Sequence, residues 1–120
     1  MTTTENRTGF KSLPAAVAIA EGQRIKINGS TWDVAAATDA AVGVATHAAA
    51  QGEELTVKLF SSPGTFLFRA NAAIAAGAQL FPTATGNVDD AGTTAIPFVA
   101  LEAATASGDL IECASIAKGA

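Results

Sequence analysis

The side chains that could support catalysis are few and lie far apart in this chain. His47 is the only histidine, and it has no cysteine or second histidine at metal-ligand spacing, which argues against a zinc site. A serine–histidine–acid triad would need a nucleophile on a strained turn, and no Gly-x-Ser-x-Gly sequence is present. We therefore expect His47 to be a surface or turn residue.

The remaining reactive and charged groups also favour structural roles. Cys113 lies in LIECAS, where apolar residues flank Glu112, so we expect a buried and unreactive thiol. The acidic pairs 53–54 and 89–90 lie in predicted turns, and even with Asn87 the second pair offers too few calcium ligands. No phosphate-binding or dinucleotide-binding glycine motif is present. The sequence predicts no catalytic, cofactor-binding or metal-binding residue, no bound cofactor, and a protein that is not an enzyme.

The composition predicts one small domain with a thin core. The chain has 120 residues, enough for a single domain, and 49% of them are apolar. Alanine supplies 29 of these residues, against six Phe and one Trp, and a buried alanine contributes far less than a buried leucine or phenylalanine. We therefore expect part of the stability to come from partner subunits.

Charge and patterning exclude several classes of partner. The formal net charge is −4 and the pI is about 4.7, which argues against nucleic-acid binding. No apolar run approaches the roughly 20 residues that span a bilayer, so no membrane partner is expected. One cysteine excludes an intrachain disulfide, and the polar N-terminus lacks a signal-peptide pattern. These features predict a protein made in the cytoplasm.

A motif occurs twice in tandem along the chain. VAIAEGQRIKI (17–27) matches AAIAAGAQLFP (72–82), and VGVATHAAAQGEELTVKL (42–59) resembles PFVALEAATASGDLIECA (97–114). Alanine matches carry little weight in an alanine-rich chain, but the ordered Ile, Gly, Val and acidic positions also agree. We expect copies at about 15–60 and 70–116, either as two units or as halves of one interleaved domain.

Each copy has the features of short strands. Ile25 and Ile27 alternate with charged residues before an Asn-Gly turn, and residues 55–59 alternate apolar and polar side chains. Short strands between Gly, Asn, Asp and Ser turns predict an all-β fold, a compact small sandwich or barrel. Short helical turns are expected at 46–51 and 70–76, where alanine is dense. A helical bundle is the alternative.

The segment 1–14 is expected to form an extended N-terminal arm ahead of a single β-rich domain at 15–120. It shows no periodicity, and Pro14 favours an extended residue before it. A frayed terminus is the alternative, but an aromatic residue favours an arm that orders on a partner. Deleting residues 1–13 would then leave the domain folded and weaken attachment. The candidate partner-binding residues are Asn6, Arg7, Phe10, Lys11 and Leu13.

Three further aromatic residues have two interpretations. Phe66 and Phe68 share one face of a predicted strand, and Trp32 lies on another short strand. Core packing is the favoured interpretation for all three. A subunit interface is the alternative, since aromatic side chains often anchor interfaces.

The second copy resembles the small capsid decoration (cement) proteins of tailed bacteriophages. That family has a Gly-led strand, a Gly-x-Val strand, and then Gly-x-Ala-x-Glu-Ala-Ala followed by Gly-Asp-x-Val-x-Val. The counterparts here are residues 77–81, 86–88, 99–104 and 108–112, and the first copy matches through 22–27, 43–45 and 52–59. The chain departs from the pattern at Phe81-Pro82 and at Phe98, where the family tends to have glycine.

The resemblance implies a structural virion protein. Such proteins are β-rich and often homotrimeric, and they bind the outer capsid surface, where they cement neighbouring major capsid protein subunits. The resemblance thus implies the major capsid protein and further copies of this chain as partners, and synthesis in the bacterial host cytoplasm. Another β-rich phage assembly component, such as a head-tail or fibre module, and a small ligand-binding domain are the alternatives.

Overall fold

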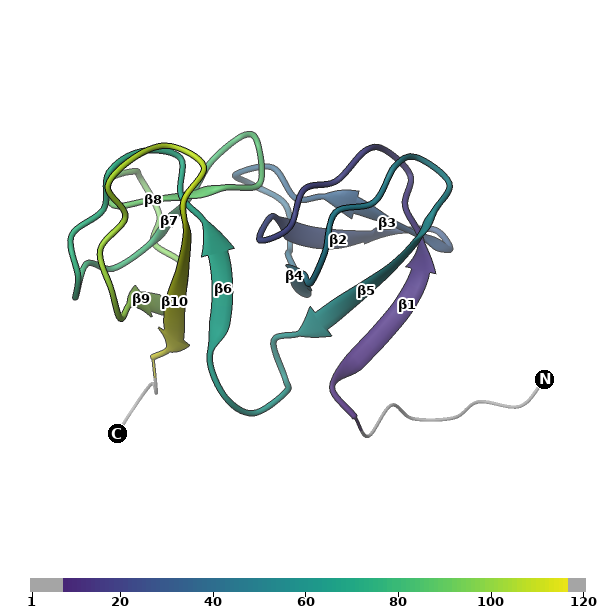
Figure 1. The fold of residues 1–120 in the computed structure, drawn as a ribbon, viewed down its shortest axis with the longest axis horizontal. Coiled ribbons are helices and arrows are strands. Elements are labelled where there is room, and N and C mark those ends of the chain that lie inside the picture. The colour runs from purple at the N-terminus through teal and green to yellow at the C-terminus, as the bar shows by residue number, and fades with distance from the viewer. Residues whose placement is uncertain (1–7, 117–120) are drawn as a thin grey trace.

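The computed structural model describes residues 8–116, which form strands and no helix, so the all-β prediction is confirmed (Figure 1). The alanine-rich stretches 46–51 and 70–76, expected as helical turns, form bends, turns and single β-bridges instead. The strands are β1 (Phe10–Pro14), β2 (Arg24–Asn28), β3 (Thr31–Val34), β4 (Gly43–Ala45), β5 (Glu54–Leu59), β6 (Phe66–Arg69), β7 (Phe81–Pro82), β8 (Val88–Asp89), β9 (Phe98–Ala100) and β10 (Leu110–Ser115).

Residues 10–59 form an antiparallel sheet that closes on itself. The strand order is β1-β5-β4-β2-β3. The sheet closes where the chain leaving β1 meets β3, because Ala15 bridges to Trp32 and the Ala16 amide donates to the Trp32 carbonyl at 2.8 Å. Closure satisfies edge hydrogen-bonding groups that an open sheet would leave to solvent. We call this unit the first barrel.

Residues 66–115 form a second unit of the same kind, which we call the second barrel (Figure 1). Strands β6, β10 and β9 pair in that order, and β7 pairs with β8. The two sheets join where Gln79 bridges to Val99 of β9, and they close where Ala70 bridges to Val88 of β8. The second barrel therefore closes at the same place along its chain as the first.

Equivalent backbone groups form the same hydrogen bonds in both barrels. Ile19 and Ala49 exchange two hydrogen bonds of 2.8 and 2.9 Å, and Ile74 and Ala104 exchange two of 2.9 Å. Both members of the first pair align with those of the second when the two copies of the motif are superimposed in sequence. The alanine-rich segments around these residues, whose matches carry little weight in the sequence, therefore have the same backbone hydrogen bonds in both copies.

The first barrel begins inside the segment expected as an arm. Strand β1 pairs antiparallel with β5 from Phe10 opposite Lys58 to Pro14 opposite Glu54, so residues 10–14 belong to the sheet. Strand β6 occupies the equivalent place in the second barrel, opposite β10. The part of the arm prediction that concerns residues 1–7 lies outside the described residues.

Aromatic rings fill the second barrel and join it to the first. The Phe98 ring lies 4.9 Å from Phe60, 5.5 Å from Phe66 and 5.0 Å from Phe68, measured between centroids, and ring pairs in this range are favourable. Phe60 follows the last strand of the first barrel yet packs against the core of the second. The core therefore crosses the boundary between the two barrels.

We predict that Phe98→Ala lowers the free energy of unfolding by about 3–5 kcal/mol, the usual cost of truncating a buried phenylalanine. The side chain is 3% exposed and contacts three other rings. Urea denaturation followed by tryptophan fluorescence would measure the loss. Ile27→Ala is the control, because Ile27 is 50% exposed and its loss should cost far less. Equal losses would contradict the shared aromatic core.

Candidate partner-binding surfaces

The predicted arm residues fall in different environments. Asn6 and Arg7 lie outside the described residues. Phe10 and Lys11 are exposed on β1. Leu13 is half-buried and packs against the core of the first barrel, so it contributes to folding as well as to any contact. Phe10 and Lys11 are therefore both exposed but lie on opposite faces of β1, and Lys11 shares its face with Leu13.

The three aromatic residues proposed for a subunit interface are inside the protein. Trp32, Phe66 and Phe68 are 3%, 2% and 0% exposed. The Trp32 indole N–H donates to the Lys11 carbonyl at 3.3 Å. Their burial agrees with the favoured interpretation, core packing.

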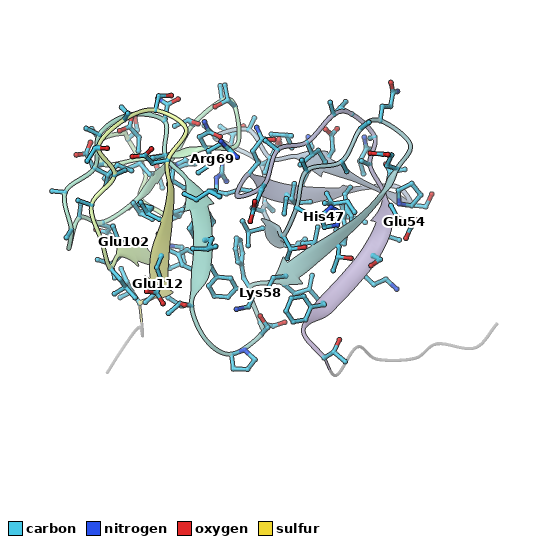
Figure 2. The ribbon with its side chains drawn as sticks, viewed as in Figure 1. His47, Glu54, Lys58, Arg69, Glu102 and Glu112 are labelled. Atoms are coloured by element: carbon cyan, nitrogen blue, oxygen red, sulfur yellow. The ribbon has the colours of Figure 1, made fainter. Side chains whose placement is uncertain are left out.

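His47 supports a strand rather than a reaction. Its Nε2 accepts a hydrogen bond from the Thr56 amide at 3.1 Å, and the equivalent position in the second barrel, Glu102, accepts one from the Glu112 amide at 2.8 Å (Figure 2). Both side chains cap an amide on the last long strand of their barrel. Across residues 8–116, no three His, Cys, Asp or Glu side chains gather as a metal site would require.

Cys113 is buried between strands of the second barrel. Burial raises the pKa of its thiol to about 12, with the nearby carboxylates of Glu102 and Glu112 adding to the shift. The thiolate, which is the nucleophilic form, is therefore scarce at neutral pH. The sequence-based expectation of an unreactive thiol agrees with this environment.

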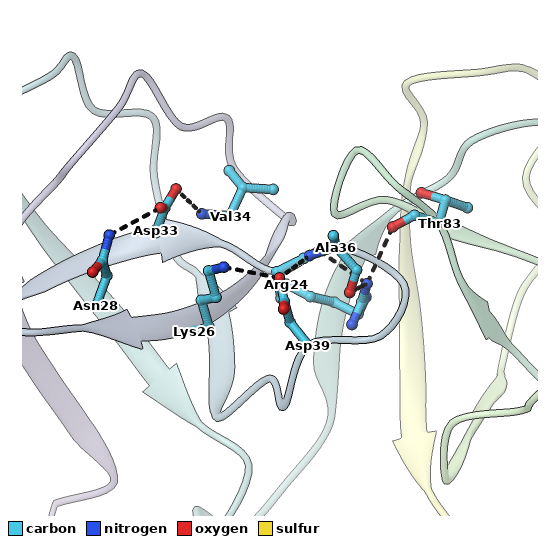
Figure 3. Close-up of polar contacts among 9 residues, drawn as sticks. Arg24, Lys26, Asn28, Asp33, Val34, Ala36, Asp39 and Thr83 are labelled. Carbon is cyan, nitrogen blue, oxygen red and sulfur yellow. Dashed lines mark hydrogen bonds and ion pairs between the residues drawn. The ribbon is translucent and has the colours of Figure 1, made fainter.

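The main polar site of the structure is a buried arginine between the two barrels. Arg24 is 2% exposed, and its Nη2 donates to the carbonyls of Ala35 and Ala36 in the first barrel at 3.0 and 3.3 Å. The same nitrogen donates to the Thr83 carbonyl of the second barrel at 3.3 Å (Figure 3). Burial lowers the pKa of Arg24, and the charge of Asp39 opposes that shift. The guanidinium thus bonds both halves of the molecule.

Sequence reasoning missed this site. The alternation in β2 sets Ile25 and Ile27 on one face and Arg24 on the other, but burial does not follow this division, since Arg24 is buried and Ile27 is exposed. The outward face at the start of β2 is covered by the second barrel, where the Arg24 amide donates to the Gly86 carbonyl at 2.9 Å. The repeat held a hint of this difference, since the second copy has the uncharged Gln79 at the position of Arg24.

A second arginine, Arg69, also bonds to both barrels (Figure 2). The Arg69 amide donates to the Gly22 carbonyl at 2.9 Å, and its Nε donates to the Glu21 carbonyl at 2.8 Å. Its Nη1 donates to the Gly108 carbonyl at 3.0 Å. A side chain at Gly22 would place its Cβ 2.8 Å from the Arg69 nitrogen and against a methyl group of Leu110, so glycine permits the close approach.

Two hollows flank this junction. One of about 270 Å³ lies between β4–β5 and β6, and its polar lining is Glu21, Lys58 and two threonines. The other, of about 320 Å³, has Arg24 and Asp39 against apolar residues such as Ile96 and Phe98. The Asp39 carboxylate already forms an ion pair of 2.9 Å with Lys26. Both hollows thus combine apolar and polar lining residues.

Comparison with known proteins identifies the family. The sequence matches the phage cement proteins over residues 11–115, which include both barrels. The chain belongs to the phage cement protein family. It is therefore a structural protein of a phage capsid, as its resemblance to the decoration proteins implied.

The fold of this cement protein has a counterpart among solved structures. The crystal structure of the head fiber gp8.5 N base of bacteriophage phi29 superposes with a TM-score of 0.71. The match covers 90% of this chain and 92% of that one, at 16% sequence identity, so the likeness concerns the fold. No curated protein sequence matches this cement protein. No helix within residues 8–116 is long and apolar enough to cross a membrane.

We predict that Arg24→Met destabilises the protein by about 1–3 kcal/mol, because it leaves buried carbonyls without their donor while keeping an apolar stem. Urea denaturation would measure the loss, and limited proteolysis of the 60–65 loop would report loosening of the junction. Lys26→Met is the matched control, since that ammonium group lies at the surface and its loss should have a smaller effect. If the two variants behave alike, Arg24 does not hold the junction.

Proposed function

We propose that this protein binds the outer surface of a bacteriophage capsid and cements neighbouring major capsid protein subunits. The observation that carries the proposal is the family match, which extends over both barrels. In this proposal the protein is made in the bacterial host cytoplasm and acts on the finished shell. It has no enzymatic role and no cofactor.

The shape of the molecule supports a bridging role. The two barrels are joined by hydrogen bonds from Arg24 and Arg69 and by a shared aromatic core. The resulting body measures 46 × 34 × 22 Å. A rigid body of this length can contact two neighbouring subunits at once without the entropic cost of ordering a linker. Many copies on one shell would reinforce modest individual contacts through avidity.

Self-association and the N-terminus complete the proposal. We expect copies to associate with one another, as homotrimers, and the first residues of each chain to contact the capsid or a neighbouring copy. In the described part of this segment, β1 exposes the aromatic residue Phe10 on one face and the cationic residue Lys11 on the other. Asn6 and Arg7 precede them in the chain.

A second candidate function is the base of a head fibre. The shared fold with the phi29 head fiber base favours it, because the match covers nearly all of both chains. In that case the protein would anchor a projecting fibre to the head rather than cement the shell. The two functions differ in where the protein lies and in whether a further chain projects from it.

We predict that cryo-electron microscopy of heads carrying this protein shows density on the outer shell that bridges adjacent major capsid protein subunits. Heads assembled without the protein are the control, and they should lose this density and break open at a lower temperature or under milder chelation. Density confined to a portal vertex or the tail would contradict the proposal. A long projection rising from each density would favour the fibre base.

We also predict that deleting residues 2–7 leaves the fold intact and weakens attachment to heads. The deletion must stop there, because removal of residues 1–13 would take most of β1 from the sheet and destabilise the first barrel. Co-sedimentation with undecorated heads would measure attachment, and the melting temperature would check folding. A variant lacking residues 117–120 is the control. Unchanged occupancy after the N-terminal deletion would exclude the arm from the contact.

A further inference from the structure

An apolar surface covers the outer face of the second barrel. Leu67, Leu101 and Ile116 are 45%, 48% and 36% exposed, and they belong to the small set of large apolar side chains that face solvent. Strand pairing brings them together. Leu67 lies opposite Glu112, and the Leu101 amide donates to the Glu112 carbonyl at 2.9 Å. Ile116 lies further along the chain on the same face as Glu112, since alternate residues of a strand share a face.

Two smaller residues make this surface continuous. Val99 on β9 lies directly opposite Ala114 on β10, and both are half-buried. Val99 shares its face with Leu101, and Ala114 shares its face with Ile116. We call this surface the leucine face. It consists of Leu67, Val99, Leu101, Ala114 and Ile116.

The equivalent surface of the first barrel is polar. Ser12 and Thr46 stand where the second barrel has Leu67 and Leu101, in the alignment that matches Ile19 with Ile74. The Ser12 and Thr56 hydroxyls are 2.8 Å apart, and the Thr46 hydroxyl donates to the Thr56 carbonyl at 2.7 Å. The same fold therefore accepts a hydroxyl-rich outer face at these positions, and the leucines of the second barrel are not required by the architecture.

The remaining positions of the leucine face have counterparts in the first barrel that the second barrel covers, whereas in the second barrel these positions are open. Val44 and Phe60 are the counterparts of Val99 and Ile116, and both pack against the core of the second barrel. Val44 is 3% exposed, whereas Ile116 is 36% exposed. Within residues 8–116, no third unit covers the leucine face. A contiguous apolar surface of this kind is characteristic of a protein interface.

The charges around the leucine face indicate the chemistry of its partner. Glu112 lies on β10 between Leu67 and Leu101, and Glu102 lies in the turn after β9, where its carboxylate accepts a hydrogen bond from the Glu112 amide (Figure 2). The Glu112 carboxylate also accepts from the Thr65 hydroxyl at 2.7 Å, so its position on the face is fixed. The nearby Lys58 ammonium is already engaged, since it donates to the Thr65 carbonyl at 2.6 Å and lies over the Phe66 ring. An apolar face that carries two carboxylates complements an apolar surface that carries lysine or arginine.

We propose that the leucine face docks this protein onto its capsid partner, at an apolar patch of the major capsid protein that also carries basic side chains. The inference rests on the proposed function and names the surface that performs it. Leu67 extends the face into the hollow of about 270 Å³ beside β4, which can receive a side chain from the partner. Docking buries leucines that the folded monomer leaves in water, and this burial stabilises the complex.

The test replaces the leucines by the residues that the first barrel carries at the same positions. Leu67→Ser combined with Leu101→Thr should weaken binding to undecorated heads by about tenfold or more, as expected for anchor residues. Its melting temperature should change little, because both side chains are exposed. Val17→Ser combined with Ile27→Thr is the matched control, since these exposed apolar residues lie on the first barrel. The control should bind as wild type does.

A second variant tests the charge of the partner without disturbing the fold. Glu102→Gln combined with Glu112→Gln keeps the hydrogen-bond acceptors and removes two negative charges. It should bind heads several-fold more weakly at low salt, and its affinity should depend less on salt than that of wild type. Unchanged or tighter binding would overturn the basic partner.

The outcomes separate this inference from the proposed function. Wild-type protein that binds heads, with a leucine variant that binds equally well, overturns the leucine face and leaves the cement function standing. Wild-type protein that does not bind heads overturns both. A leucine variant that dissociates into smaller species by light scattering, yet binds heads normally as a monomer, assigns the face to self-association and overturns the capsid contact.

Discussion

The two barrels of this cement protein are held as one body by a positive charge that the fold buries between them. The Arg24 guanidinium bonds backbone carbonyls on both sides of the junction, and burial lowers its pKa. A buried charge needs hydrogen-bond partners, and those of the Arg24 Nη2 lie in both barrels, while its buried Nε has no partner among the described residues. Arg69 adds bonds in the same place. The spacing of the two outer surfaces depends on this junction.

The alanine-rich composition explains why the two barrels share core residues. Each barrel has few large side chains of its own, and Phe60 and Val44 of the first barrel complete the core of the second. The position of Phe98 corresponds to Gly43, where a Cβ would lie 2.5 Å from the Lys58 carbonyl oxygen. The second barrel therefore has an open interior filled by a ring, while the first brings two backbones close together. Divergence between the copies lies mainly in how each interior is filled.

The sequence predicted the class of fold and the family but not the junction. Alternation and turn residues identified short strands, and the small-residue motifs identified the family. Local patterns cannot show which face of a strand a second unit covers, so alternation alone did not reveal that Arg24 is buried and Ile27 exposed. Strand β1 gave no period-2 signal, because Leu13 is the one residue of its five that is not exposed. The leucine face was missed because exposed apolar residues gain meaning only when strand pairing places them together.

Strand β1 ends in Pro14, at the position where β6 carries Arg69. Arg69 docks the second barrel onto the first by giving its amide hydrogen to the Gly22 carbonyl, and the equivalent carbonyl in the second barrel belongs to Gly77. Proline has no amide hydrogen, so the first barrel of another molecule cannot repeat that bond on Gly77. This bond of the tandem contact therefore joins the two units of one molecule and is not available between molecules.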